Sequence, residues 1–555
     1  MGLRTRGNNR PTAAHGLHLR LVPRRAHYRD VRLHLPAVTE RLHGASFGAA
    51  RFTLSSPPMI SDDGVLAPLL DQAAQGYRAT LLSQGVRLAC KAVSVVVLAR
   101  LVSPVDHGLF AMAASLFMLL ALFRDLGLGA AAVQARTLSE EQLSTLWRVH
   151  AVLGVALTVL AVALAPVLAA FYHEPRVARL AASMSVGLLL VGLNAWPRVL
   201  LTRQLRFAEL NRLETLAAVI GTGAAIVAGA LGAGAYAFVA FLLASEIVSL
   251  IEAWRVCRWR PSAAARRDSL RGIWRTGFNL TGYNVLLYFQ QQLDTLLMGK
   301  WFGAGALGLY NRPAQLLALP LQHATAPLTQ VLMAALSRLG TDSPEFARHV
   351  RATANLIAHL TLPLAVVCLT LPHETVRLIL GAAWPDAAPL LRWLAVSAAT
   401  SYLAATIYGV SVASGHSQRL ALMSVVALAA NGLGLWIGRA HGPVGLAAGL
   451  AGSNLMLLGP RLWWAARGTP LRLGDFAAAF SGPLVLAAVT AAGVLITHRL
   501  IGEANWLVRF GVSLAGGAAT AVALVIAWPR LRDEWRYVSD HLPWSQRRAP
   551  RPSPS

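Results

Sequence analysis

The sequence carries little charge for its length. Asp, Glu, Lys and Arg make up 14% of its 555 residues, whereas about 25% is usual in a soluble globular domain. So few charged side chains cannot cover the surface of a water-soluble chain, and the mean hydropathy of +0.51 agrees with this conclusion. Since a bilayer-spanning helix needs about 20 apolar residues, the composition predicts an all-α polytopic membrane protein.

The sequence also lacks the residues of several common sites. Its three cysteines, Cys90, Cys257 and Cys368, are far apart and lie within or beside apolar runs, which indicates neither a disulfide framework nor a metal site. No glycine-rich phosphate loop of the Walker type is present, so we expect no ATP hydrolysis by the chain itself. The sequence therefore predicts no metal and no cofactor.

Acidic residues are scarce beside basic ones, 25 against 50, and the net charge is +25. In a soluble chain this excess would suggest a nucleic-acid partner. Here one set of alternating loops between the apolar runs holds 21 arginines, while the opposite set holds six basic residues. This asymmetry follows the positive-inside rule, so we expect both termini in the cytoplasm and no nucleic-acid partner.

Residues 1–58 do not resemble the rest of the chain. They hold ten arginines and five histidines, and they lack the apolar stretch of a signal peptide. The next methionine after Met1 is Met59. We expect either a disordered basic leader or a start of translation at Met59, and we favour the second interpretation.

Fourteen apolar runs of spanning length follow this segment. They are 79–101, 107–123, 149–171, 178–197, 213–232, 235–254, 276–298, 307–335, 353–372, 388–411, 418–438, 443–464, 477–497 and 505–528. We predict about 14 transmembrane helices, and an even number agrees with two cytoplasmic termini. The predicted organisation is an N-terminal bundle (75–260), a C-terminal bundle (261–465), two additional helices (466–528) and a basic cytoplasmic tail (529–555).

The sequence repeats weakly at an offset of 200 residues. Arg100 and the triplet Gly108–Phe110 align with Lys300 and the triplet Gly308–Tyr310, and both copies keep the eight-residue spacing. The aligned residues end the first helix of each half, which predicts two pseudo-symmetric six-helix bundles around a central cavity. Internal repeats flank a midplane site in many secondary transporters, so the repeat favours a transporter over an enzyme.

Several stretches resemble the Wzx-type polysaccharide flippases of the MOP superfamily, which also contains the lipid II flippase MurJ and the MATE exporters. They are Leu98–Phe110, Phe123–Gln134, Leu205–Pro261 and Gln292–Arg312, within a resemblance that covers about residues 75–480. The resemblance implies two helix bundles around a cavity in the bacterial inner membrane. It implies translocation of an undecaprenyl-diphosphate-linked oligosaccharide for O-antigen or exopolysaccharide synthesis, by alternating access coupled to a proton or sodium gradient. The other partners that it implies are membrane lipids, a polysaccharide polymerase and export machinery.

Charged side chains inside a span are costly in lipid and indicate function by default. Arg87 and Lys91 are four residues apart and therefore share one helix face, and the 200-residue offset aligns Lys91 with Gln291. We predict that Arg87, Lys91, Gln291 and Arg312 line the cavity and that its cations bind the lipid diphosphate. The alternatives are that Lys91 extends to the membrane surface and that Arg87 pairs with Asp294 structurally.

Two acidic residues are candidates for ion coupling. Asp294, beside three glutamines, is predicted to titrate and to couple substrate movement to a proton or a sodium ion, and the alternative is a fixed ion pair. Glu246 is a second coupling candidate, or a hydrogen-bonding group inside its own lobe, which we favour. No residue has a predicted catalytic role.

Other classes fit the sequence less well. A MATE-like exporter of cations would not present a basic stripe in its first span. A membrane polysaccharide polymerase or ligase would cluster catalytic acids on the outer face, where the acids are scattered. A non-transporting scaffold would leave Arg87 and Asp294 unexplained.

The tryptophans lie near the ends of the predicted spans, and interfacial anchoring explains them without a role in sugar stacking. The set comprises Trp196, Trp301, Trp384, Trp463, Trp464 and Trp528.

Overall fold

The computed structural model describes residues 63–532 except for 126–128, 130–131, 133–138, 205, 258, 262–270, 340–342, 415–416, 503–504 and 530–531. In these residues the chain forms helices and no strand. The predictions for the leader (1–58) and for most of the tail (529–555) lie outside the described residues.

α-Helices cover the predicted apolar runs, and one further short helix, α10 (Pro372–Ile379), lies between two of the runs. The helices are α1 (Asp63–Leu101), α2 (Pro104–Asp125), α4 (Glu140–Tyr172), α5 (Arg176–Arg203), α6 (Phe207–Ala230), α7 (Tyr236–Cys257), α8 (Arg271–Leu339), α9 (Pro344–Thr370), α10 (Pro372–Ile379), α11 (Ala387–Leu403), α12 (Ala405–Ala413), α13 (Ser417–Gly438), α14 (Gly442–Ala466), α15 (Leu473–Leu500) and α16 (Trp506–Ala527). Eleven stretches of the described helices are long and apolar enough to cross a membrane. The chain is therefore a polytopic helical membrane protein.

The longest helix, α8, consists of two helices joined at Gly303. This glycine has φ 79° and ψ −176°, a conformation that residues with a side chain rarely adopt. Asp294 contacts Tyr310 across the joint, although in a straight helix these residues would lie about 24 Å apart along the axis. The chain therefore folds back at Gly303, and the predicted runs 276–298 and 307–335 form its two arms.

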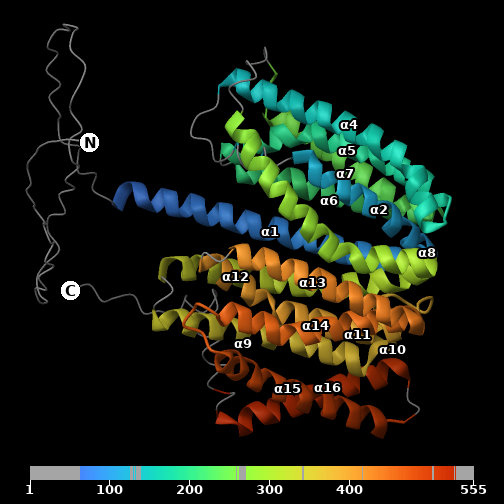
Figure 1. The fold of residues 1–555 in the computed structure, drawn as a ribbon, viewed down its shortest axis with the longest axis vertical. Coiled ribbons are helices and arrows are strands. Elements are labelled where there is room, and N and C mark those ends of the chain that lie inside the picture. Colours follow the sequence, from blue (N-terminus) through green and yellow to red (C-terminus); the bar gives the residue numbers. More distant parts are fainter. Residues whose placement is uncertain are drawn as a thin grey trace, which may run out of the picture. The chain divides into compact units, whose positions relative to one another are not determined.

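The helices pack in two groups, and α8 contacts both. Figure 1 shows α4, α5, α6 and α7 side by side, and contacts between α2 and α5 add α2 to this group. The second group contains α9, α11, α13 and α14, and α15 joins it through α9 while α16 packs on α15. Since α8 packs on α2 and also on α9, α11 and α13, it is the element through which the two groups meet.

α2 and α8 approach each other closely at the two glycines of the repeat. A Cβ atom on Gly108 would lie 1.7 Å from the backbone oxygen of Ala304, and a Cβ atom on Gly308 would lie 1.8 Å from that of Pro104. Only glycine permits so close a contact. Pro104 and Ala304 are themselves 200 residues apart, so the two contacts are equivalent under the 200-residue offset of the repeat.

Basic residues beside this crossing also act reciprocally. Arg100 donates a hydrogen bond to the carbonyl of Leu378 in α10 at 3.1 Å. Lys300, its counterpart in the repeat, donates to the carbonyl of Phe171 near the end of α4. Each cation thus satisfies a carbonyl at the C-terminal end of a helix in the other half, where the helix dipole favours positive charge. The two halves are joined at this end of α1.

The prediction of interfacial anchoring is wrong for two of the tryptophans. Trp384 and Trp196 both have 0% of their surface exposed. The indole of Trp384 donates to the carbonyl of Ala99 at 2.7 Å, and Trp196 packs among buried residues that include Leu146 and Leu200. Both side chains pack against neighbouring helices. Nearness to a span end indicates how deep a residue lies in the membrane, but it does not indicate which face of the helix carries the side chain.

Candidate functional site

A cavity of about 660 Å³ lies between α1, α2, α6, α7 and α8. Five of the six residues predicted from the sequence line this one cavity: Arg87, Lys91, Gln291, Asp294 and Arg312. The sixth, Glu246, is not among the described lining residues. We call this space the cationic cavity, because three of these residues carry a positive charge.

Lys91 and Gln291 are the most accessible of the five. Both side chains are exposed, and neither has a hydrogen-bond or ion-pair partner among the residues that the structure describes. They occupy equivalent positions of the 200-residue repeat. The ammonium of Lys91 and the amide of Gln291 are therefore available to a ligand.

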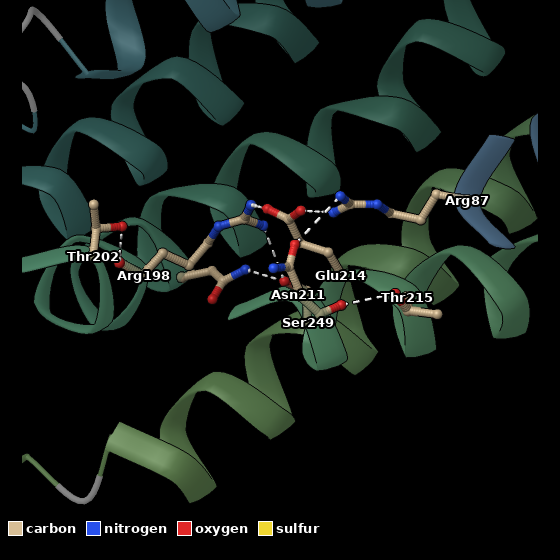
Figure 2. Close-up of polar contacts among 8 residues, drawn as sticks. Arg87, Arg198, Thr202, Asn211, Glu214, Thr215 and Ser249 are labelled. Carbon is tan, nitrogen blue, oxygen red and sulfur yellow. Dashed lines mark hydrogen bonds and ion pairs between the residues drawn. The ribbon is translucent and has the colours of Figure 1, made fainter. Parts of the chain in front are cut away.

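Arg87 is held by a carboxylate that the sequence analysis did not single out. Its guanidinium forms an ion pair with Glu214 of α6, which also pairs with Arg198 of α5. Figure 2 shows Glu214 between the two arginines, with Asn211 accepting a further hydrogen bond from Arg87 at 3.4 Å. The alternative pairing of Arg87 with Asp294 is thus replaced by a pair with Glu214.

Further polar residues surround this cluster inside the first helix group. Arg198 donates to the hydroxyl of Ser249 at 3.3 Å, and Asn194 donates to the same oxygen at 2.7 Å. Glu246 lies close enough to Arg198 and Arg124 to interact with both charges. Glu246 thus belongs to this cluster of the first helix group and not to the described lining of the cationic cavity.

Both carboxylate oxygens of Asp294 accept hydrogen bonds from neutral donors. The Tyr310 hydroxyl donates to Oδ2 at 2.6 Å, and the backbone N–H of Thr295 donates to Oδ1 at 2.8 Å. Tyr310 is fully buried, and it reaches Asp294 only because α8 folds back at Gly303. Among the described residues, the Asp294 carboxylate therefore has neutral hydrogen-bond donors and no ion-pair partner.

Arg312 connects α8 to α1. It is 6% exposed, and its guanidinium donates to the carbonyls of Ser94 and Val95 in α1 at 3.2 and 3.0 Å and to the Gln315 amide at 2.9 Å. Its Nε has no hydrogen-bond partner within the described part of the chain. The side chain therefore fixes α1 against α8 and retains one unused donor.

A second cavity of about 640 Å³ lies between α8, α11, α12, α13 and α14. Gln291, Asp294 and Gln322 line both cavities, so α8 forms a shared wall. Sequence reasoning missed this space, and it also missed Glu214. Asp294 was singled out because charged residues inside a span indicate function. The same rule would have found Glu214, which is an acid at the start of a predicted span (213–232).

Comparison with known proteins shows similarity to proteins of polysaccharide biosynthesis. Residues 97–389 match the family described as "Polysaccharide biosynthesis protein". The chain is 24% identical over 274 residues to the teichuronic acid biosynthesis protein TuaB of Bacillus subtilis, a match that covers 49% of this chain and 57% of that protein. It is 22% identical over 330 residues to the lipopolysaccharide biosynthesis protein WzxC of Escherichia coli, covering 59% of this chain and 67% of that one. The matched region thus spans 57% and 67% of the lengths of these two relatives.

Among solved structures, the fold is similar to that of the lipid II flippase MurJ in an inward closed conformation. The TM-score is 0.64 at 15% sequence identity, and the match covers 82% of this chain and 99% of the other. This likeness concerns the fold alone.

Proposed function

The chain belongs to the polysaccharide biosynthesis protein family, and from this membership we propose that it is a flippase for an undecaprenyl-diphosphate-linked oligosaccharide. In this proposal it acts as a transporter and not as an enzyme. It serves the synthesis of a surface polysaccharide, such as the lipopolysaccharide O-antigen or an exopolysaccharide, in the bacterial inner membrane.

The observation that carries the proposal is the cationic cavity. Arg87, Lys91 and Arg312 line it between helices of a membrane protein. A lipid diphosphate has negative charge that must leave water to cross a bilayer, and charge-assisted hydrogen bonds from arginine and lysine offset that cost. Relatives named for teichuronic acid and lipopolysaccharide biosynthesis, and the fold shared with a lipid II flippase, support a substrate of this class.

We further propose a topology of fourteen spans with both termini in the cytoplasm. The two bundles comprise residues 75–260 and 261–465, with α15 and α16 as additional helices. This orientation places the crossing of α2 and α8 at Gly108 and Gly308 near the outer face, since Gly108 follows the first span. The cavities then receive substrate from the cytoplasmic side, and alternating access requires the crossing to open.

Reconstitution of the full chain tests the function directly. Liposomes would contain a fluorescent undecaprenyl-diphosphate oligosaccharide, and the measurement is the fraction of fluorescence reached by a membrane-impermeant quencher, with and without a pH or sodium gradient. We expect gradient-dependent movement of chemically unchanged substrate. A lengthened or transferred glycan without movement would instead identify a polymerase or ligase.

Arg87→Ala is expected to reduce transport to the background of empty liposomes, because it removes a cation that lines the cavity. Arg198→Ala is the matched control. Each variant leaves Glu214 with one arginine, but Arg198 is not among the described residues that line the cavity. Both should lose about 2 kcal/mol of stability, the contribution of a hydrogen bond to a charged group, and transport should survive only in Arg198→Ala. Equal transport in the two variants would contradict a role for Arg87 in binding.

Asp294→Asn is expected to abolish export in cells and to remove the effect of an imposed gradient in liposomes, because the amide cannot bind a proton or replace the carboxylate as a cation ligand. Tyr310→Phe is the control, since it removes one neutral donor and keeps the carboxylate. The rate of quencher access at several gradients is the measurement. An unchanged gradient dependence in Asp294→Asn would place ion coupling elsewhere in the chain.

A further inference from the structure

The second cavity differs from the cationic cavity in the chemistry of its lining. The described residues around it include one basic side chain, Arg461, while its other polar groups are mainly amides and hydroxyls. Two asparagines of neighbouring helices, Asn431 in α13 and Asn454 in α14, lie in its wall. We call it the amide cavity.

Each of these asparagines uses one end of its amide within the protein. Asn454 Nδ2 donates to the Ser397 hydroxyl at 3.0 Å, and Asn431 Oδ1 accepts from the Ser453 hydroxyl at 2.8 Å. The opposite ends, the carbonyl of Asn454 and the amino group of Asn431, have no partner among the residues described. The cavity therefore presents one acceptor and one donor in fixed positions.

Fixed donors and acceptors of this kind suit hydroxyl groups, each of which both donates and accepts a hydrogen bond. Because the asparagines are already held by their neighbours, little side-chain freedom is lost when they bind. Tyr402 and Tyr408 line the same cavity from α11 and α12, and 47% of the Tyr408 surface is exposed. Such aromatic rings offer a large apolar surface with a polar tip, which matches the mixed apolar and hydroxyl faces of a sugar ring.

The amide cavity and the cationic cavity border each other at α8, since Gln291, Asp294 and Gln322 belong to both linings. A ligand that lies against these three side chains can therefore extend an anionic part into one space and a neutral part into the other. We propose that the amide cavity binds the oligosaccharide of the substrate, built of neutral hexoses, while the diphosphate occupies the cationic cavity. This inference rests on the proposed function and extends it to a separate glycan subsite.

Two probes separate the subsites: undecaprenyl diphosphate alone, and the same lipid carrying a tetrasaccharide of neutral hexoses. Their dissociation constants would be measured on the full chain in nanodiscs. We expect the glycan to tighten binding by about tenfold, or 1.4 kcal/mol, in the parent protein. Asn431→Leu and Asn454→Leu should lose this gain and keep the affinity for undecaprenyl diphosphate.

Ser424→Ala is the matched control. Ser424 also lines the amide cavity, but its hydroxyl donates to the Leu420 carbonyl of its own helix at 3.0 Å. The glycan should therefore keep its full effect in this variant. If undecaprenyl diphosphate does not bind the parent at all, the proposed function fails. If it binds but the glycan adds nothing, the glycan subsite alone is overturned.

A second measurement does not depend on the folding of the asparagine variants. Ser401 is exposed and lines the amide cavity, so Ser401→Cys in a Cys90→Ser background can be alkylated with a maleimide. The glycan-bearing lipid should slow this reaction, and undecaprenyl diphosphate should not. Equal rates with both lipids would contradict the proposed position of the glycan.

Discussion

Gly308→Ala is expected to abolish transport while the protein still inserts into the membrane. The added Cβ would lie 1.8 Å from the backbone oxygen of Pro104. A backbone atom cannot relieve such a clash by changing rotamer, as a side chain can. Overpacking of this kind costs about 1–3 kcal/mol, and the cost falls only on the conformation in which α2 and α8 cross here. Since about 1.4 kcal/mol changes an equilibrium tenfold, the substitution should shift the protein to conformations in which this end is open.

Gly108→Ala should have the same effect, because its Cβ would lie 1.7 Å from the Ala304 oxygen in the equivalent contact of the repeat. Gly305→Ala is the control. It lies three residues from Gly308 in the same helix arm, and its added Cβ would meet its nearest neighbour at 3.8 Å, an ordinary contact. We therefore expect Gly305→Ala to transport like the parent.

Labelling of a native cysteine can measure whether the outer end of the cationic cavity is open. Cys90 lines the cationic cavity, while Cys257 and Cys368 are buried. A membrane-impermeant maleimide added to the outer face should label Cys90 faster in Gly308→Ala than in the parent or in Gly305→Ala, and Cys90→Ser gives the background. Unchanged labelling together with unchanged transport would mean that the crossing does not close the outer end.

The sequence was sufficient to predict the class of the protein and much of the cationic cavity. Hydropathy decides whether a chain enters a bilayer, and charges within spans are rare enough to stand out, as Arg87 and Asp294 did. The i, i+4 spacing of Arg87 and Lys91 gave a shared face, and the offset of 200 residues connected Lys91 to Gln291. All four residues line one cavity, and the repeat itself is visible in the contacts of Gly108 and Gly308.

Partners across helices were beyond sequence reasoning. Arg87 and Glu214 are 127 residues apart, and their pairing depends on how α1 packs on α6. The Tyr310 donor to Asp294 depends on the fold at Gly303; the sequence separated the runs 276–298 and 307–335 but did not show which of their side chains would meet. The amide cavity was missed for a different reason. Asn431 and Asn454 carry no charge that would single them out within a span, and their position in one wall depends on how α13 and α14 pack.

The second large effect is expected at Arg312. Arg312→Gln should weaken the binding of undecaprenyl diphosphate by about tenfold or more and reduce transport to background, because it removes a positive charge from the cationic cavity. It also removes the hydrogen bonds to the carbonyls of Ser94 and Val95. Hydrogen bonds from a charged group contribute about 1.5–3 kcal/mol each, so the melting temperature should fall as well.

Arg312→Lys separates the charge from the geometry. Lysine keeps the positive charge, but its single ammonium cannot reproduce the planar fork that bonds α1 and Gln315 together. We expect its affinity for undecaprenyl diphosphate to lie near that of the parent and its melting temperature near that of Arg312→Gln. Gln315→Leu is the control, because it removes only the 2.9 Å partner of the guanidinium and leaves the charge in place. Parent-like affinity in Arg312→Gln would show that the guanidinium serves only to bond α1. Binding of the diphosphate would then depend on Arg87 and Lys91.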